Sequence, residues 1–243
     1  RIESPEIVVV TGMRRVGKTT ALTMLFNEIS SRNKAFIDIE NPIEQRIFEE
    51  KDFNNIWANL EAYGISNREK SYLVLDEIQA MPAIVKAIKY LYDHSGQGRK
   101  IKFFLTGSSS FYLKNLFPES LAGRKRIFEL NPLDFEEFLV FKGRSRRFTD
   151  AFADKEREKN EIRFEKNRKL YDEYLLWGGF PQVVLENDPA EKTAQLKDIV
   201  KSYFEKDVRL ISDFRKINQF RDLLLLLFKR AGTRLDMTKL ASE

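Results

Sequence analysis

A glycine-rich loop directly after a short apolar run is the feature that most constrains how this chain can fold. The loop is Gly12-Met13-Arg14-Arg15-Val16-Gly17-Lys18-Thr19, which fits the pattern G-x-x-x-x-G-K-[ST]. The apolar run Ile7 to Val10 precedes it, and apolar residues at helical spacing follow it. A P-loop needs this order of strand, loop and helix, because the loop N–H groups and the positive end of the helix face the phosphates. The sequence therefore predicts an α/β fold with a phosphate site at the end of its first strand.

The loop residues are expected to hold the phosphates of a nucleotide together with Mg²⁺. Lys18 would reach the β- and γ-phosphates, and the hydroxyl of Thr19 would bind the metal ion. The glycines would let the loop wrap around the phosphate chain. The predicted nucleotide-binding residues of this stretch are Gly12, Met13, Arg14, Arg15, Val16, Gly17, Lys18, Thr19 and Thr20.

Four more short apolar runs alternate with helical patterns through the first half of the chain. They are Ala35 to Ile39, Tyr72 to Leu75, Ile101 to Leu105 and Arg126 to Leu130. Five such runs separated by helices favour a parallel five-stranded sheet that is covered by helices on both faces. Sites in these sheets lie at the carboxyl ends of the strands, so the polar residues that follow each run are candidates.

Two adjacent carboxylates, Asp76 and Glu77, follow the third run. Carboxylates at the end of a buried strand are costly unless they have partners. We expect Asp76 to hold Mg²⁺ and Glu77 to orient or deprotonate the attacking water. The fourth run ends in Thr106-Gly107-Ser108. Thr106 and Ser108 are candidates for hydrogen bonds to the γ-phosphate or to the water.

An arginine beside the γ-phosphate could neutralise the charge that develops in the transition state. Arg124 is one candidate, and Arg15 in the loop itself is the other. The sequence leaves this choice open. An arginine supplied by a second copy of the chain would require an oligomer, whereas one from the same chain would not.

The second half of the chain predicts helices rather than strands. Asp134 with Glu137 fits a capping box that opens a short helix. The pair Asp188-Pro189 fits the start of another helix. The segment Ile217 to Lys229 predicts a third helix, apolar nearly all round through its leucine run and therefore expected to be buried.

The composition limits the environment and the partners of the protein. The 243 residues include no Cys, which excludes disulfides and thiolate metal sites and favours a reducing compartment. No apolar run approaches the roughly 20 residues that cross a bilayer, and no secretory leader is visible, so we expect a cytoplasmic protein with no membrane partner. The net charge of +5 permits contact with DNA without requiring it.

Taken in order, the motifs resemble those of archaeal and bacterial ATPases of the AAA+ superfamily that carry a C-terminal domain of unknown function. The matching segments are the P-loop, Leu73 to Gln79, Leu105 to Ser110, Leu121 to Arg124, Pro132 to Phe138 and Gly178 to Pro181. The resemblance implies a P-loop core of the additional-strand type over residues 1–142, a helical lid over 143–230 and the start of a winged helix over 231–243. It also implies ATP or ADP with Mg²⁺ as ligands.

The resemblance further implies that Asp76 supports the metal, that Glu77 is the catalytic carboxylate, and that Thr106 or Ser108 is the sensor. It does not assign a second sensor arginine in the helical part. Candidates for that role are Arg209, Arg215 and Arg221.

These observations predict a Mg²⁺-dependent ATPase that works as a nucleotide-driven switch or motor, with ATP bound between the sheet edge and the lid. One alternative is a non-hydrolysing nucleotide sensor that acts as a scaffold or DNA-binding regulator, although Glu77 favours the enzyme. A small-molecule P-loop kinase is disfavoured because a long helical tail follows the fifth run. DNA, a protein partner and a second copy of the chain all stay open as partners.

Overall fold

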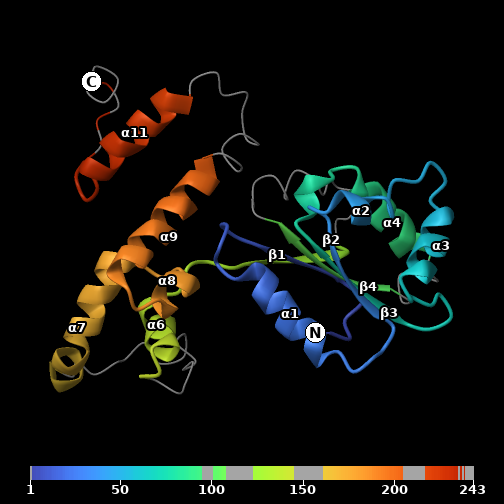
Figure 1. Cartoon of the computed structure of the whole chain (residues 1–243), viewed down its shortest axis with the longest axis horizontal. Coiled ribbons are helices and arrows are strands. Elements are labelled where there is room, and N and C mark those ends of the chain that lie inside the picture. Colours follow the sequence, from blue (N-terminus) through green and yellow to red (C-terminus); the bar gives the residue numbers. More distant parts are fainter. Residues whose placement is uncertain are drawn as a thin grey trace.

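A five-stranded parallel sheet forms the centre of the first part of the molecule (Figure 1), and its strand order is β2-β3-β4-β1-β5. The computed structural model describes residues 2–94, 101–107, 123–144, 161–204, 217–234, 236 and 238. The strands are β1 (Ile7–Thr11), β2 (Lys34–Asp38), β3 (Ser71–Asp76), β4 (Ile101–Gly107) and β5 (Lys125–Glu129). All neighbouring strands pair in parallel, which confirms the predicted fold class.

Helices cover both faces of this sheet, since successive strand residues point to opposite sides. Val8, Val74 and Phe104 pack with Leu22 of α1 (Lys18–Glu28) on one face. A larger apolar cluster covers the other face. It joins the strands to α3 (Asn55–Ala62), to the short helix η1 (Ile78–Ala80) and to α4 (Ile84–His94), while α2 (Pro42–Gln45) follows β2. Every residue of β3 and β4 is buried, as expected for central strands of a covered parallel sheet.

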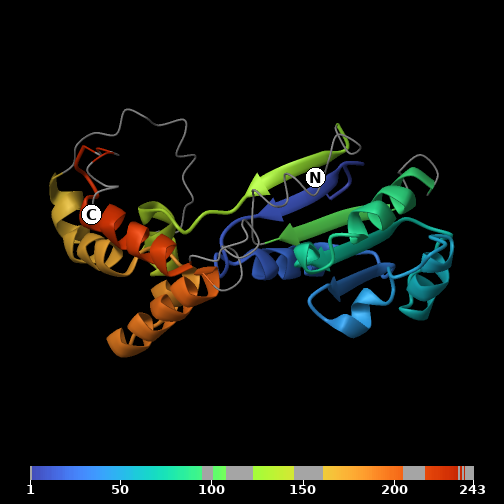
Figure 2. The same cartoon turned by 90° about the horizontal axis from the view of Figure 1, so that it is seen from above.

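The helical second part lies at the carboxyl ends of the strands, toward which the strand arrows point (Figure 2). Its helices are α6 (Phe135–Phe141), α7 (Glu161–Trp177), α8 (Pro181–Leu185), α9 (Pro189–Ser202) and α11 (Ile217–Lys229). The predicted capping box is present at α6: the Asp134 side chain accepts from Glu137 N at 2.8 Å, and the Glu137 side chain accepts from Asp134 N at 2.9 Å.

Close backbone contact joins the start of α6 to the turn before α8. Leu133 N donates to Gly179 O at 2.7 Å. A Cβ on residue 179 would lie 2.0 Å from Leu133 O, so this position requires glycine. Phe138, Leu139 and Val184 form a buried cluster beside it, and this cluster is separate from the two that cover the sheet. The helical part therefore has a small core of its own.

The expectation that α11 is buried is wrong for its apolar face. Leu225 is 52% exposed and Phe228 is 71% exposed. Between α9 and α11 lies an open apolar cavity of about 650 Å³. Residues of α9 and α11 line most of this cavity, together with Trp177 of α7, and much of the apolar face of α11 stays uncovered in the described residues. No helix in the described ranges combines the length and apolar character needed to span a membrane.

Candidate nucleotide-binding site

The loop between β1 and α1 has the backbone geometry that its glycines allow. Gly12 has φ 147°, and a Cβ there would lie 2.1 Å from Leu130 O, the carbonyl that follows β5. Gly17 has φ 98° and caps α1, which has neither a side-chain cap nor an acidic residue in its first turn. The first N–H groups of α1 and its positive end thus face the loop without a competing carboxylate, an arrangement that suits an anion.

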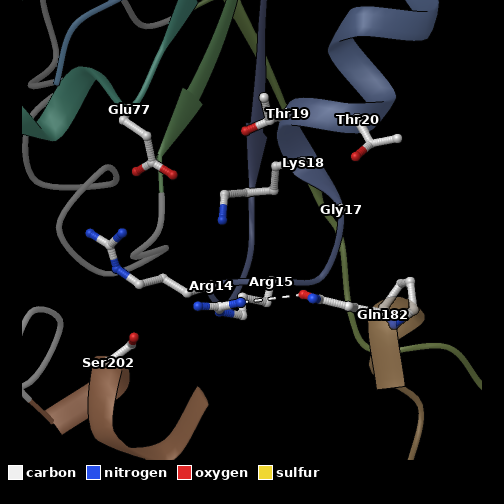
Figure 3. A pocket seen from close by; sticks show the side chains of 10 residues that line it. Arg14, Arg15, Gly17, Lys18, Thr19, Thr20, Glu77, Gln182 and Ser202 are labelled. Carbon is white, nitrogen blue, oxygen red and sulfur yellow. Dashed lines mark hydrogen bonds between the residues drawn. The ribbon is translucent and has the colours of Figure 1, made fainter. Parts of the chain in front are cut away.

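Lys18 lies inside this loop. Its side chain is buried, and its Nζ donates to Gly12 O at 3.1 Å and to Met13 O at 3.0 Å. Figure 3 shows the ammonium pointing into the space between the loop and Glu77. A cation held there can meet the terminal phosphates of a nucleotide whose phosphate chain follows the loop.

The carboxylate of Asp76 links the P-loop to the end of β3. Thr19 Oγ1 donates to Asp76 Oδ2 at 2.8 Å, and Thr106 Oγ1 donates to Asp76 Oδ1. Thr106 Oγ1 also accepts from Glu77 N at 2.9 Å. The hydroxyl of Thr106 therefore contacts both Asp76 and Glu77 and positions them. Thr106 is not among the residues that line the cavity beside the P-loop, which is described below.

The Thr19 hydroxyl and the Asp76 carboxylate fit a Mg²⁺ ion in character, because Mg²⁺ binds through one or two carboxylates together with substrate phosphates and water. In the described part of the chain no group of three or more His, Cys, Asp or Glu could hold a metal ion. A Mg²⁺ ion held by Thr19 and Asp76 would complete its coordination with nucleotide oxygens and water.

Glu77 adopts a left-handed backbone with φ 52°, which is uncommon for a residue other than glycine and recurs at functional sites. Burial raises the pKa of its carboxyl, while the hydrogen bond from Gln79 and the charges of Lys18 and Arg14 act to lower the pKa. Gln79 Nε2 donates to Glu77 Oε2. The sequence analysis did not predict that Gln79 contacts Glu77, the candidate catalytic residue. A polar side chain two residues after Glu77 could have indicated this contact.

A cavity of about 400 Å³ lies between the P-loop and the helical part (Figure 3). Its walls are Arg14, Arg15, Gly17, Lys18, Thr19, Thr20, Glu77, Pro181, Gln182 and Ser202. The last three come from α8 and α9, which were not predicted to contribute site residues. These three residues are far from the P-loop in the sequence, so no local pattern predicted that they would line the cavity. The volume lies in the range of ligand pockets.

The two loop arginines point in different directions. Arg14 lies on the Glu77 side of the cavity in Figure 3, and its Nη2 is 3.6 Å from Glu40 Oε1. Arg15 reaches the helical part instead: its Nη1 donates to Gln182 Oε1 at 3.3 Å, and its Nη2 forms an ion pair with Asp198.

Arg124 does not lie beside the P-loop of its own chain, so it could meet a γ-phosphate only in a neighbouring copy, and its catalytic role stays a prediction. Ile7 N donates to Arg124 O at 2.8 Å, so Arg124 lies where β1 begins. The P-loop begins where β1 ends, about 16 Å further along a strand of five residues. The side chain of Arg124 pairs with Asp93 at the end of α4. This register places Arg124 at the amino ends of the strands, opposite the end at which the P-loop lies.

The remaining candidates are either outside the described residues or lie elsewhere in the described part of the chain. Ser108, Arg209 and Arg215 lie outside the described residues, as do Met237 and most of the predicted start of a winged helix. Arg221 pairs with Asp222 at 3.1 Å and lines the apolar cavity between α9 and α11.

A family model described as "AAA domain" matches residues 4–139, more than half of the chain. The chain belongs to this AAA domain family. A second model, for a domain of unknown function (DUF8612), matches residues 168–243. The resemblance to AAA+ ATPases is thereby confirmed, and an AAA domain with this P-loop is a nucleotide-binding domain of the ATPase type.

Relatives of the AAA domain protein are longer than this chain. This chain is 32% identical over 228 residues to an uncharacterized protein of Methanocaldococcus jannaschii, and the match covers 92% of this chain and 47% of the relative. It is 26% identical over 247 residues to an uncharacterized protein of Haemophilus influenzae, covering 97% of this chain and 54% of the relative. The chain thus spans about half the length of these relatives.

The fold of the AAA domain protein also matches a solved structure. The Walker-type ATPase PABY2304 of Pyrococcus abyssi aligns with a TM-score of 0.53 at 17% sequence identity, over 98% of this chain and 82% of that chain. At this identity the match supports the fold, including the helical part that follows the sheet.

Proposed function

We propose that this AAA domain protein is a Mg²⁺-dependent ATPase that works as a nucleotide-driven switch, with the nucleotide bound between the P-loop and the lid formed by α6 to α9. The observation that carries the proposal is that Glu77 lines the same cavity as Lys18 and Thr19. A carboxylate, an ammonium and a hydroxyl around one cavity are the groups that phosphoryl transfer to water requires.

Each of these residues has a chemical task in the proposed reaction. The Lys18 ammonium would bind the β- and γ-phosphates, and the loop N–H groups would hold the rest of the chain. Thr19 and Asp76 would hold Mg²⁺, which supplies positive charge to the phosphate oxygens when bound. The Glu77 carboxylate would orient the attacking water and accept its proton.

Arg14 replaces Arg124 as the arginine that could act within the same chain. Its guanidinium lines the cavity on the side of Glu77, where the γ-phosphate would lie if the phosphate chain follows the P-loop. There it would stabilise negative charge on the phosphoryl group in the transition state.

The test is steady-state ATP hydrolysis and ATP binding by the wild type, Lys18→Ala and Glu77→Gln, with Glu61→Gln on the exposed side of α3 as the matched control. We expect Glu77→Gln to bind ATP and to hydrolyse it at least about 100-fold more slowly, which is the usual contribution of a general base. Lys18→Ala should lose binding, and Glu61→Gln should match the wild type. Full hydrolysis by Lys18→Ala, or no nucleotide binding by the wild type, would contradict the proposal.

The same measurement separates the enzyme from a non-hydrolysing sensor. Tight ATP binding without turnover by the wild type would assign the protein to the sensor class. Each protein is also measured with and without double-stranded DNA, because the net charge of +5 permits contact with DNA. Stimulation of hydrolysis by DNA would support a DNA-linked switch, and its absence would favour a protein partner.

A further inference from the structure

The contact between Arg15 and the lid is a direct bridge from the phosphate-binding loop to the helical part. Arg15 Nη1 donates to Gln182 on α8, and Arg15 Nη2 pairs with Asp198 on α9. Arg15 has a left-handed backbone with φ 65°, which is uncommon for an arginine. The lid also approaches the loop directly, since a Cβ on Gly17 would lie 4.0 Å from Pro181 Cγ.

The lid partners of Arg15 lie beside the residues that form the lid wall of the cavity. Gln182 is itself a wall residue and follows Pro181. Asp198 precedes the wall residue Ser202 by four positions on α9, so the two share one face of that helix. A shift of α8 and α9 away from Arg15 would therefore carry away the lid side of the nucleotide cavity.

We propose that Asp198 and Gln182 are positioning residues that hold Arg15 and so fasten the lid over a bound nucleotide, which slows nucleotide release. This inference rests on the proposed function, because it needs a nucleotide in the cavity. It assigns the coupling between the P-loop and the lid to an arginine of the loop and a carboxylate of the lid.

The contact can be altered without removing the core of the lid. Asp198 has a half-exposed side chain and lies outside the cluster of Phe138, Leu139 and Val184. On the same helix, Ile199 and Lys192 are buried and provide the anchors of α9. Replacing the carboxylate of Asp198 should therefore change the attachment of the lid to the loop rather than the fold of the lid.

The experiment measures the rate at which fluorescent ATP and ADP analogues leave the whole protein, for the wild type and Asp198→Asn. Glu191→Gln is the matched control, since Glu191 is an exposed acid at the other end of α9. We expect Asp198→Asn to release both nucleotides about 2- to 5-fold faster, the range for an exposed ion pair. KM for ATP should rise without a fall in kcat, and the difference should shrink at high salt because the pair is exposed.

A double-mutant cycle separates this role from a purely structural one. Arg15→Asn and Asp198→Asn are each expected to release nucleotide faster, and the double variant is expected to be no faster than the faster of the two. Asn is chosen at position 15 because it tolerates the left-handed backbone and adds no negative charge beside the phosphates. A wild type that binds nucleotide and an Asp198→Asn variant that releases it at the same rate would overturn the inference while leaving the proposed function intact.

Two further outcomes also count against the inference. If the effects of the two single substitutions add in full in the double variant, they are independent and do not come from the contact between Arg15 and Asp198. If the wild type binds no nucleotide, the proposed function fails and this inference fails with it.

Discussion

At the scale of single residues, Glu77 is the group in which burial and charge oppose one another. Burial raises the pKa of its carboxyl above the ordinary value of 4.5, and the hydrogen bond from Gln79 is the strongest influence in the other direction. A general base must be deprotonated to act. Hydrolysis should therefore rise with pH through the pKa of Glu77, at a higher pH than for an exposed glutamate.

Gln79→Leu should move this pH dependence. The substitution keeps a buried side chain of similar size and removes the donor that lowers the pKa of Glu77. Loss of the donor should raise the pKa of Glu77, because the ionised carboxylate is then less stabilised. The midpoint of kcat against pH therefore shifts to higher pH, and activity at low pH falls. The measurement is kcat from pH 5 to pH 9 at saturating ATP. A variant with an unchanged midpoint would show that another group controls the profile.

Site residues that belong to the sequence pattern were predictable, and those that depend on packing were not. The pattern placed Lys18 and Thr19, because a P-loop specifies its own backbone and fixes which side chains face the phosphates. The structure brings Asp76 to Thr19 as the end of an apolar strand suggested. Asp198 had no signal, since its position beside the loop depends on how the lid docks.

At the scale of helices, Glu173 on α7 ties three elements of the lid together. Its Oε1 accepts from Lys142, which follows α6, at 2.9 Å and from Lys192 on α9 at 2.7 Å. Lys192 is buried, and its Nζ lies 5.6 Å from the centre of the Trp177 ring. Burial acts to raise the pKa of Glu173, but the two lysine contacts outweigh it and lower the pKa.

Glu173→Gln should destabilise the lid by about 1–3 kcal/mol at neutral pH, because Lys192 would lose its charged partner in a buried place. A lowered carboxyl pKa stabilises the fold above the ordinary pKa and loses that effect as pH falls through the folded pKa. The difference between the wild type and the variant should therefore shrink in acid.

The measurement is denaturant unfolding at several pH values, followed by Trp177 fluorescence in a Trp57→Phe background. Asp172→Asn is the matched control, because Asp172 is an exposed neighbour on the same helix. A difference that stays constant down to acidic pH would contradict the assigned role of the carboxylate.

Elements were predictable where a periodic pattern met a clear boundary. All five strands and the capped helix α6 lie where the sequence indicated them, because apolar runs and caps are local signals. The burial of α11 was not predictable from its composition. An apolar helix is buried only when other elements cover it, and in the described residues an open cavity lies between α9 and α11.

At the scale of the whole molecule, strand register decides at which end of the strands each residue lies. Arg124 precedes β5, which pairs in parallel with β1, and this pairing places it at the edge where β1 begins. The sequence distance between Arg124 and the P-loop contains no such information. The proposed division into residues 1–142, 143–230 and 231–243 likewise stays a prediction.

Arg124→Ala should leave ATP binding and hydrolysis within about 2-fold of the wild type and should lower stability by about 0.2–1 kcal/mol, the range for an exposed ion pair. Arg126→Ala is the matched control, since Arg126 pairs with Glu6 near the same edge at 3.4 Å. ATPase assays and denaturant unfolding check both variants. Loss of hydrolysis with binding retained in Arg124→Ala alone would mean that Arg124 acts on the nucleotide of a neighbouring copy.

The position of β1 also has a consequence for the order in which the protein can fold. β1 precedes both of its partners in the chain, and these are the distant strands β4 (Ile101–Gly107) and β5 (Lys125–Glu129). During synthesis on the ribosome it can pair with neither strand until those distant segments have emerged. Strands that are far apart in the sequence pair slowly. An apolar strand is prone to aggregate until its pairing partners are available. The phosphate-binding loop at the end of β1 would therefore mature late, after most of the sheet has been made.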